Sequence, residues 1–496
     1  MARSLLCSAV LLALSVPVLV AQRPAPAVGA TSITESGVRR RIDLIAADSM
    51  LGRNTPSRTL DLTAVYVARE FRRAGLVTTV QRYPITRRKL IPARSTISIA
   101  GPGGKATLSL TQDAALMQGS IPPRPVSGGL VLLGGAVDPD RIVADSIRGK
   151  VVLWLPDMSP KGAPKLNAIA ASLIKSGPAL VMLATSDGSL LAGARAGQTA
   201  EQSRLEGAAG LGFTLLAVSE PALVEARPDL AATVAAVRAD TGTALVSVVG
   251  TTVTATLVDT LIGRATAPNV IGVLRGAGPR ADEYLALSAH MDHLGVASGA
   301  PGDSVYNGAD DNGSGTVGIL ELAAAFARGP RPKRSLVFIV VSGEEKGLWG
   351  SGYFTEHPTV PLGRIVADVN MDMIGRNWKD TVGVIGREHS DLGQVLDSVA
   401  ARHPELRMTP IGDVWPTEGR FYRSDHYNFA RHGVPILFLS SGYSPDYHEL
   451  TDSPDKIDAE KEARLLRLVY YFGLELANRK ERPVWRPESY RAIVLR

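Results

Sequence analysis

Two histidines and three acidic residues of this chain have the chemistry of metal ligands: His290, Asp311, Glu345, Asp372 and His448. Nitrogen and oxygen ligands without a thiolate suit zinc or another borderline divalent metal. Two Zn²⁺ ions bring four positive charges, which three carboxylates and one bridging hydroxide balance if both histidines are neutral. The set therefore predicts a site where two metal ions bind and activate one water for hydrolysis.

Two further acids stand beside these candidate ligands. Glu344 directly precedes Glu345 after an apolar run, where neighbouring carboxylates are costly unless a metal or a proton compensates them. Adjacent side chains diverge, so Glu345 can bind metal while Glu344 reaches the water. Asp292 follows His290 by two positions, which in an extended chain places both on one side, so its carboxylate can accept the second ring N–H. Each residue alone fits an ordinary turn, cap or loop, and only their combination favours a metal site.

Short apolar runs that are typical of buried strands precede most of these residues. They span 283–289, 335–341, 364–369 and 434–439, and a helical pattern covers 316–328. The Gly-rich segment 307–315 around Asp311 also has the residues of a turn and a helix N-terminus. Strands that alternate with helices are usually parallel, and ligands gather beyond their carboxyl ends. We therefore expect an α/β fold with a mixed, largely parallel sheet flanked by helices.

Five stretches resemble, in order, the motifs of the co-catalytic zinc exopeptidases, which include bacterial leucyl aminopeptidases, aminopeptidase Y and glutamate carboxypeptidases. They are residues 289–292, 308–315, 342–351, 370–373 and 447–448. The resemblance covers about 49–76, including Leu51-Gly52-Arg53, and about 267–477. It implies the phosphorylase/hydrolase-like fold of that family.

The resemblance also implies a division of the ligands between two ions. His290 and Asp372 would hold one zinc, Glu345 and His448 would hold the other, and Asp311 would bridge them. Other divalent metals remain compatible with this ligand set.

The remaining roles come from the same resemblance. Glu344 would be the general base that takes a proton from water and returns it to the leaving amine. Asp292 would orient His290. Tyr422 lies near the place of an oxyanion-stabilising tyrosine without matching its spacing, and the segment 424–426 resembles a stretch near the substrate pocket. The histidines outside the ligand set are expected to be structural, with His293 and His426 as the candidates for exceptions.

Composition indicates a globular protein of two domains. The chain has 496 residues, 45% hydrophobic and 21% charged, and its net charge of +6 comes from scattered arginines, which does not indicate nucleic-acid binding. An apolar stretch at 5–20 after Arg3 predicts a secretory signal over 1–21 rather than a retained membrane anchor. The single cysteine, Cys7, would leave with it, so we expect a disulfide-free protein exported to the periplasm or exterior, without stable membrane insertion.

The middle of the chain predicts a smaller α/β domain over 107–249, inserted into a peptidase domain over 31–106 and 253–480. Strand-like runs cover 129–133, 151–155 and 180–183, a helix-like run covers 165–175, and 188–210 is loop-like. Residues 149–153 resemble part of a protease-associated domain, although an unrelated insert has the same pattern. An amphipathic helix is expected over 460–478, followed by a peripheral tail over 481–496.

These features favour a secreted di-zinc exopeptidase that acts on peptides as an aminopeptidase. A carboxypeptidase for acidic C-terminal residues is the alternative within the same family. An aminopeptidase needs an acidic group for the substrate amine, whereas a carboxypeptidase needs Arg or Lys for the carboxylate. A non-catalytic binding protein would be expected to lack ligands or the base, and a single-zinc cyclase of N-terminal glutamine is a third alternative.

Overall fold

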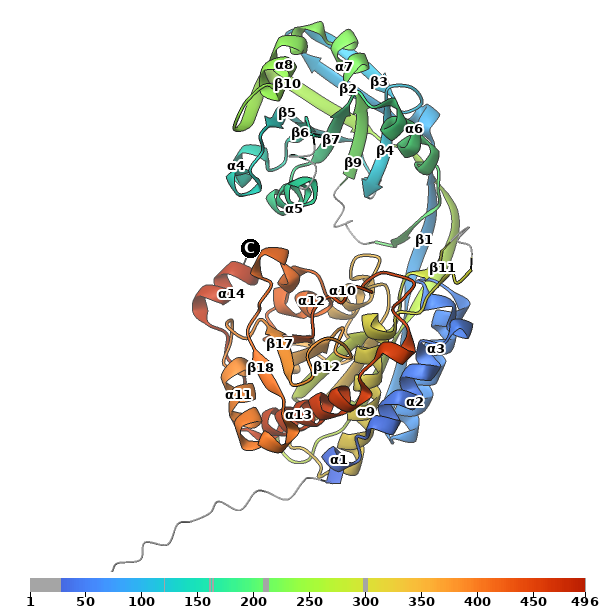
Figure 1. Ribbon diagram of the computed structural model, residues 1–496, viewed down its shortest axis with the longest axis vertical. Coiled ribbons are helices and arrows are strands. Elements are labelled where there is room, and N and C mark those ends of the chain that lie inside the picture. The colour runs from blue at the N-terminus through green and yellow to red at the C-terminus, as the bar shows by residue number, and fades with distance from the viewer. Residues whose placement is uncertain are drawn as a thin grey trace, which may run out of the picture.

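The computed structural model describes residues 28–119, 121–159, 162, 165–207, 214–297 and 302–495. These residues form a nine-stranded sheet, an eight-stranded sheet and a two-stranded ribbon, with helices packed on the larger sheets (Figure 1). The expected export signal over 1–21 lies outside the described residues. In the described part of the chain, no helix has the length and apolar character to cross a membrane.

The nine-stranded sheet carries the predicted ligands. Its strands, in spatial order, are β18 (Thr409–Ile411), β17 (Thr381–Ile385), β19 (Ile436–Ser440), β16 (Ile365–Met371), β12 (Tyr284–His290), β15 (Ser335–Val341), β11 (Asp259–Leu274), β1 (Val77–Leu90) and β8 (Gln202–Leu205). The central strands β19, β16, β12 and β15 pair in parallel, whereas β11, β1 and β8 continue the sheet in antiparallel fashion. The predicted mixed α/β sheet is confirmed, with parallel pairing concentrated at its centre.

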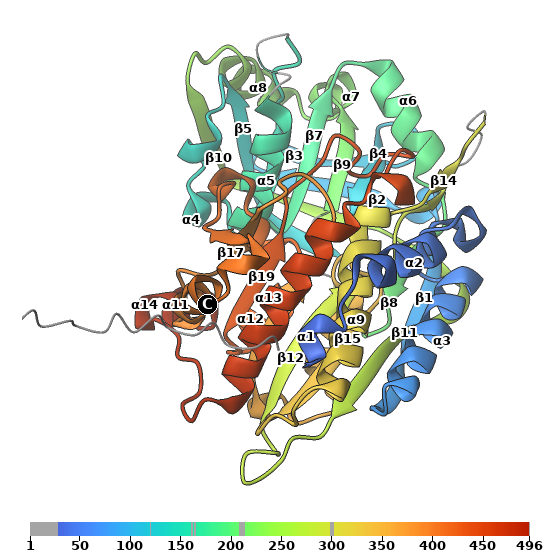
Figure 2. The same cartoon turned by 60° about the horizontal axis from the view of Figure 1, so that its bottom comes forward.

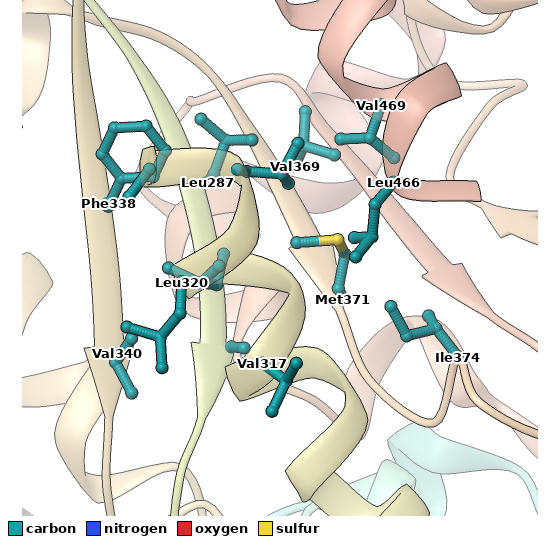
Figure 3. Packing of buried hydrophobic residues seen from close by; sticks show 14 of the residues in the cluster. Leu287, Val317, Leu320, Phe338, Val340, Val369, Met371, Ile374, Leu466 and Val469 are labelled. Carbon is teal, nitrogen blue, oxygen red and sulfur yellow. The ribbon is translucent and has the colours of Figure 1, made fainter. Parts of the chain in front are cut away.

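The four central strands are buried along their whole length, as their continuous apolar sequences require. Leu287 of β12 is in register with Phe338 of β15 and Val369 of β16. Helices α9 (Gly315–Arg328) and α13 (Ala459–Asn478) cover this face with Leu320 and Leu466 (Figure 3). The core therefore fixes the register in which the strand ends reach the site.

Other helices complete the two layers around the sheet. Helices α2 (Glu35–Ile45), α3 (Arg58–Arg73) and α11 (Leu392–Arg402) share the core of α9 and α13 (Figure 2). Helices α10 (Trp349–Glu356) and α12 (His426–Arg431) pack on the opposite face, where Phe354 and Phe429 meet Phe438 of β19. The four strands and two helices predicted between 283 and 478 lie within two residues of the observed bounds.

The eight-stranded sheet forms the second part of the molecule. Its order is β3 (Gly104–Ser109), β2 (Thr96–Gly101), β10 (Thr243–Thr256), β5 (Val126–Gly135), β6 (Val151–Trp154), β7 (Leu180–Thr185), β9 (Thr214–Ser219) and β4 (Ala114–Gly119). Residues 96–106, which the sequence placed with the peptidase domain, lie in this sheet. The long strands β1 and β11 pair with each other where the chain leaves and re-enters the first sheet (Figure 1).

The prediction of a loop over 188–210 was wrong for much of its length. Helix α6 spans Gly188–Gly197, because Asp187 caps its first amides and Leu191 is buried against the sheet despite three glycines. Strand β8 then leaves the second part of the molecule and pairs with β1 in the first sheet. Helices α5 (Leu166–Ser176), α7 (Glu220–Ala226) and α8 (Ala231–Arg238) also cover the second sheet.

The expected peripheral tail contains a packed helix, α14 (Pro487–Ile493). Ile493 is buried in the core beside α12, and the Trp485 indole N–H donates to the Gly433 carbonyl at 2.9 Å. Helix α14 is therefore packed against the part of the molecule that contains the nine-stranded sheet.

Candidate active site

The five predicted ligands meet at the carboxyl edge of the central strands. His290 is the last residue of β12, Asp372 directly follows β16, and Glu345 lies four residues beyond β15. Asp311 occupies the turn Ala309–Ser314 before α9, and His448 lies in the loop after β19. Parallel strands bring these ends together, so residues far apart in sequence become neighbours.

Asp311 stands between two pairs of ligands. Its Oδ1 lies 3.4 Å from His290 Nε2, which is also 3.4 Å from Asp372 Oδ1. Its Oδ2 lies 3.1 Å from His448 Nε2, which is also 3.2 Å from Glu345 Oε2. Asp311 thus stands between two pairs of side chains, His290 with Asp372 on one of its oxygens and His448 with Glu345 on the other; these two groups are called half-sites below.

Several of these ligand atoms are buried without a hydrogen-bond partner among the described residues. They are His290 Nε2, His448 Nε2 and Asp372 Oδ1. Buried polar atoms rarely remain unpaired, because the loss of hydration is costly. Divalent cations would satisfy all three atoms, so the residues present fit a metal centre.

The carboxylates of the site attract positive charge strongly. Burial lowers the pKa of the His448 imidazole, but the contacts with Asp311 and Glu345 outweigh burial and raise it to about 10. Burial likewise raises the pKa of Asp311, yet its contacts with His290 and His448 hold it well below the usual range. Because metal binding needs neutral imidazole, a bound metal ion would displace these protons.

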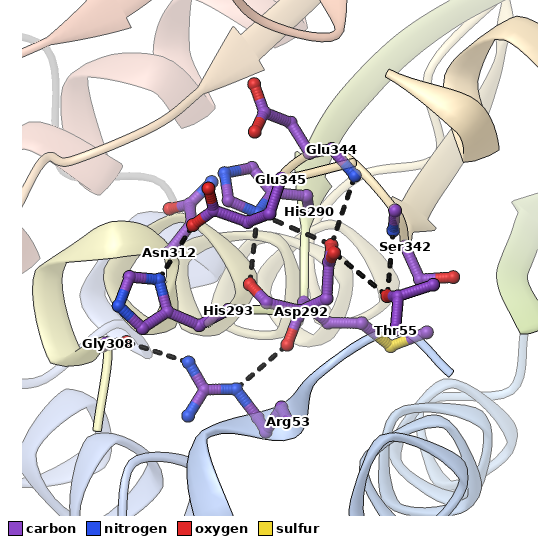
Figure 4. Close-up of polar contacts among 12 residues, drawn as sticks. Arg53, Thr55, His290, Asp292, His293, Gly308, Asn312, Ser342, Glu344 and Glu345 are labelled. Carbon is purple, nitrogen blue, oxygen red and sulfur yellow. Dashed lines mark hydrogen bonds and ion pairs between the residues drawn. The ribbon is translucent and has the colours of Figure 1, made fainter. Parts of the chain in front are cut away.

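Asp292 supports the site in a different way from the one predicted. Its backbone carbonyl is the near acceptor for His290 Nδ1, at 3.2 Å, whereas its carboxylate lies 3.7 Å away. A carbonyl can only accept, so Nδ1 carries the hydrogen and Nε2 is left free for a metal. The carboxylate instead accepts from the Thr55 hydroxyl at 2.9 Å and from the Glu344 amide at 3.3 Å (Figure 4).

The Glu344 side chain is half-buried and lines a cavity beside Asp311 and Asp372. Its carboxylate also lies close enough to His290 and Asp372 to share a cation with them. Burial raises the pKa of Glu344 well above its ordinary value, His290 opposes the rise, and Glu345 adds to it. A carboxylate of raised basicity next to the ligands suits proton transfer.

His293 belongs to the site, although the sequence marked it only as a candidate exception. It is fully buried, and its Nδ1 lies 2.8 Å from Glu345 Oε1. The same ring approaches His448, with 5.8 Å between centroids. Its position three residues after His290 was the available signal.

Arg53 is a positioning residue whose importance the sequence only suggested. Its buried guanidinium donates to the carbonyls of Met291 at 2.8 Å and Asn307 at 2.7 Å. It also donates to the Gly308 carbonyl at 2.8 Å (Figure 4). Burial lowers the pKa of Arg53 to about 10, so it stays charged at neutral pH. It thereby ties the chain after His290 to the turn before Asp311.

Two other acceptors hold the metal-binding segments in place. The Asp452 carboxylate accepts the amides of Asp310 and Asp311, at 3.0 and 3.1 Å. Asp372 Oδ2 accepts from the Ser424 hydroxyl at 2.9 Å, which gives the predicted segment 424–426 a place beside the site.

Two candidates from the sequence lie outside the ligand cluster. Tyr422 is 47% exposed and does not line the cavity, whereas Tyr443 and Tyr447 do. His426 stacks on Phe438 at 4.5 Å between centroids, and burial lowers its pKa to about 3. His426 therefore packs as a neutral ring.

Comparison with known proteins agrees with this geometry. Residues 269–473 match the model of Peptidase family M28. A probable leucine aminopeptidase of Trichophyton verrucosum is 28% identical over 221 residues, which cover 42% of this chain and 58% of that protein. Aminopeptidase YwaD of Bacillus subtilis is 27% identical over 231 residues, covering 44% of this chain and 46% of that protein. This chain thus matches only about half of the length of these relatives.

Solved structures share the fold over nearly the whole chain. An aminopeptidase from Aneurinibacillus sp. strain AM-1 superposes with a TM-score of 0.53 at 18% identity, covering 92% of this chain and 97% of that one. A zinc aminopeptidase from Bacillus subtilis gives a TM-score of 0.50 at 18% identity, covering 90% and 96%. Residues 269–473 are therefore similar in sequence to Peptidase family M28.

Proposed function

We propose that this protein is a metallo-aminopeptidase that uses two zinc ions to remove N-terminal residues from peptides. The observation that carries this proposal is the pair of half-sites on either side of Asp311, with unpartnered ligand atoms directed between them. The names of similar proteins, which include leucine aminopeptidases, support the choice of the amino end.

The ligand set assigns residues to each ion. His290 and Asp372 would hold one ion, His448 and Glu345 would hold the other, and Asp311 would serve both. Divalent ions bound there supply a water of lowered pKa and polarise the scissile carbonyl. The absence of sulfur ligands keeps zinc, cobalt and manganese as candidate metals.

The chain itself supplies proton transfer and alignment. Glu344 is placed to take a proton from the attacking water and deliver it to the departing amine. Asp292 fixes the tautomer of His290 through its carbonyl and the Glu344 loop through its carboxylate. Ser424 holds Asp372 from the other side.

Export and the identity of the inserted part remain predictions from the sequence. Secretion to the periplasm or exterior rests on the apolar N-terminal stretch. A protease-associated character of the second part rests on the resemblance of residues 149–153, which overlap strand β6 of the eight-stranded sheet.

A pair of substrates tests the proposed activity. The purified protein is freed of metal with a chelator, restored with zinc, and assayed with leucine p-nitroanilide and with its N-acetylated analogue. An aminopeptidase cleaves only the free-amine substrate, and only after zinc is restored. If zinc instead restores release of C-terminal glutamate from an acylated dipeptide while neither anilide is cleaved, the enzyme is a carboxypeptidase and the proposal is wrong.

A further inference from the structure

Next to the candidate metal site is a small cavity of about 30 Å³ that opens to solvent. Its lining joins the acidic residues of the site to two guanidinium groups, those of Arg420 and Arg423. Within the described residues, the apolar side chains of this lining are Met373 and Phe438, and the rings of Tyr443 and Tyr447 complete it. A pocket for a leucine side chain would be predominantly apolar, so this lining suits a different group.

Arg420 is held rigidly in this lining. Its guanidinium lies between the rings of Trp415 and Tyr443, at 4.0 and 3.7 Å from their centroids. Glu418 Oε2 accepts from its Nε at 2.9 Å and lies 2.8 Å from its Nη2. Such stacking and pairing fix the orientation of the planar group.

The contacts with Glu418 involve Nε and Nη2 of Arg420 and leave its Nη1 unused. Arg420 Nη1 is buried and has no hydrogen-bond partner within the described residues, while the whole side chain is only 3% exposed. A buried charged N–H without an acceptor is costly. In a cavity wall it is a donor positioned for a ligand.

Stacked rings connect this arginine to the metal site. Tyr443 stacks on Tyr447 at 4.1 Å between centroids, and Tyr447 stacks on the metal ligand His448 at 3.9 Å. Trp378 stacks on Trp415 at 5.6 Å between centroids. These stacked rings, with the Arg420 guanidinium between Trp415 and Tyr443, are called the column below. The column therefore sets the position of the Arg420 donor relative to the metal-binding residues.

Arg423 contributes the net charge of this wall. Glu418 neutralises Arg420, whereas the exposed Arg423 has no ion-pair partner in the described part of the chain. Its guanidinium lies 5.7 Å from the Tyr443 ring, on the same column. One fixed donor and one free cation together match a carboxylate, for which the guanidinium fork is geometrically suited.

We propose that Arg420 and Arg423 form a carboxylate-binding subsite, so that this enzyme prefers peptides carrying a carboxylate next to the scissile bond. The carboxylate is either the side chain of an N-terminal Asp or Glu or the α-carboxylate of a short peptide. This inference rests on the proposed function and specifies its substrate class.

Matched substrates separate the two sources of the carboxylate. Glutamate p-nitroanilide and glutamine p-nitroanilide differ only in the side-chain charge, and Leu-Leu and Leu-Leu-amide differ only in the C-terminal charge. We expect kcat/KM to favour the charged member of at least one pair by about tenfold or more, as for a lost charge-assisted hydrogen bond. Arg423→Gln should remove most of that preference, measured as the ratio of kcat/KM within each pair of substrates.

Arg364→Gln is the matched control, because Arg364 is a 52% exposed arginine outside the cavity. It should keep the preference of the wild type. If leucine p-nitroanilide is cleaved but neither charged substrate depends on Arg423, the subsite is refuted and the aminopeptidase proposal stands.

Binding gives a readout that needs no turnover. Calorimetry compares glutamic acid α-amide, glutamine and glutamine amide, which carry a side-chain carboxylate, an α-carboxylate and no carboxylate. The subsite predicts that one of the first two binds about tenfold tighter than glutamine amide, and that Arg423→Gln abolishes the difference. Equal binding of all three by the wild type would overturn the subsite even in a protein that hydrolyses nothing.

Discussion

For single residues, the chemistry of the site depends on which atom of each side chain faces the carboxylate of Asp311. The carbonyl of Asp292 fixes the hydrogen of His290 on Nδ1, and Ser424 occupies one oxygen of Asp372. Their other atoms, Nε2 and Oδ1, are thereby left for a metal. Glu344 is different, because it lines the cavity and is free to exchange a proton.

Replacing Glu344 with Gln tests this separation of roles. The amide keeps the shape of the side chain but cannot accept the proton, so kcat should fall by about 10²–10⁴-fold. All five ligands remain, so zinc content measured by atomic absorption should equal that of the wild type. A variant with full zinc and normal turnover would remove Glu344 from the mechanism.

At the scale of elements, the loop between β19 and α13 is the part of the site that no strand supports. His448 lies in it with φ of 58°, a conformation that is strained for a residue with a side chain. The Asp446 carboxylate holds this loop in place. It accepts hydrogen bonds from Lys456 and Thr451, at 2.5 Å each, and from Arg376 at 2.8 Å. The ligand position of His448 therefore depends on the Asp446 contacts.

Asp446→Asn should destabilise the metal-free protein by about 1–3 kcal/mol at pH 7, because charge-assisted hydrogen bonds are lost. The contacts with Lys456 and Thr451 hold the pKa of Asp446 well below its usual range. A depressed pKa gives stability that is present above the unfolded-state value of about 4 and is lost as pH falls below it. Urea unfolding should thus show a difference between wild type and variant at pH 7 that shrinks toward pH 3.

The exposed Asp282 provides the control for this comparison. Asp282→Asn should change stability little at either pH, since its ion pair with Arg364 is at the surface. A difference for Asp446→Asn that stays constant or grows as the pH falls would contradict the assigned role of its charge.

Much of the element structure could be predicted because the signals were local. The continuous apolar strands ending at His290 and Val341 and the helices α9 and α13 follow from periodicity in the sequence. Helix α6 was missed because its glycines weaken the helical pattern, and the membership of β2 in the second sheet depends on pairing with β10, far along the chain. Asp452 was missed as a site residue, and Arg53 was only suggested by the resemblance, because their partners are distant in sequence.

In the molecule as a whole, the predicted metal-binding residues join the ends of three buried strands, the turn before α9 and the loop after β19. Without bound metal, three carboxylates share a small buried space, where their mutual repulsion is costly. Metal bound only to the native state stabilises it by mass action, to about 4 kcal/mol at a concentration a thousand times Kd. The metal should therefore contribute to the stability of the fold as well as to catalysis.

Removal of metal should lower Tm by on the order of 5–10 °C, and zinc should restore it. Differential scanning calorimetry of the chelated and restored protein measures this change. Glu344→Gln retains every ligand and should show the same rise with zinc, whereas His448→Ala should show a smaller one. Identical Tm values for chelated and zinc-restored wild type would show that these residues do not bind metal in the folded state.

A zinc titration of the metal-free protein, followed by calorimetry and by hydrolysis of leucine p-nitroanilide, tests whether the site binds two metal ions. Two half-sites that share Asp311 predict two equivalents of bound zinc and activity that appears with zinc and is absent without it. His448→Ala, which removes one ligand of one half-site, should bind a single equivalent tightly. Saturation of the wild type at one equivalent, or hydrolysis that is independent of zinc, would contradict the two-metal site.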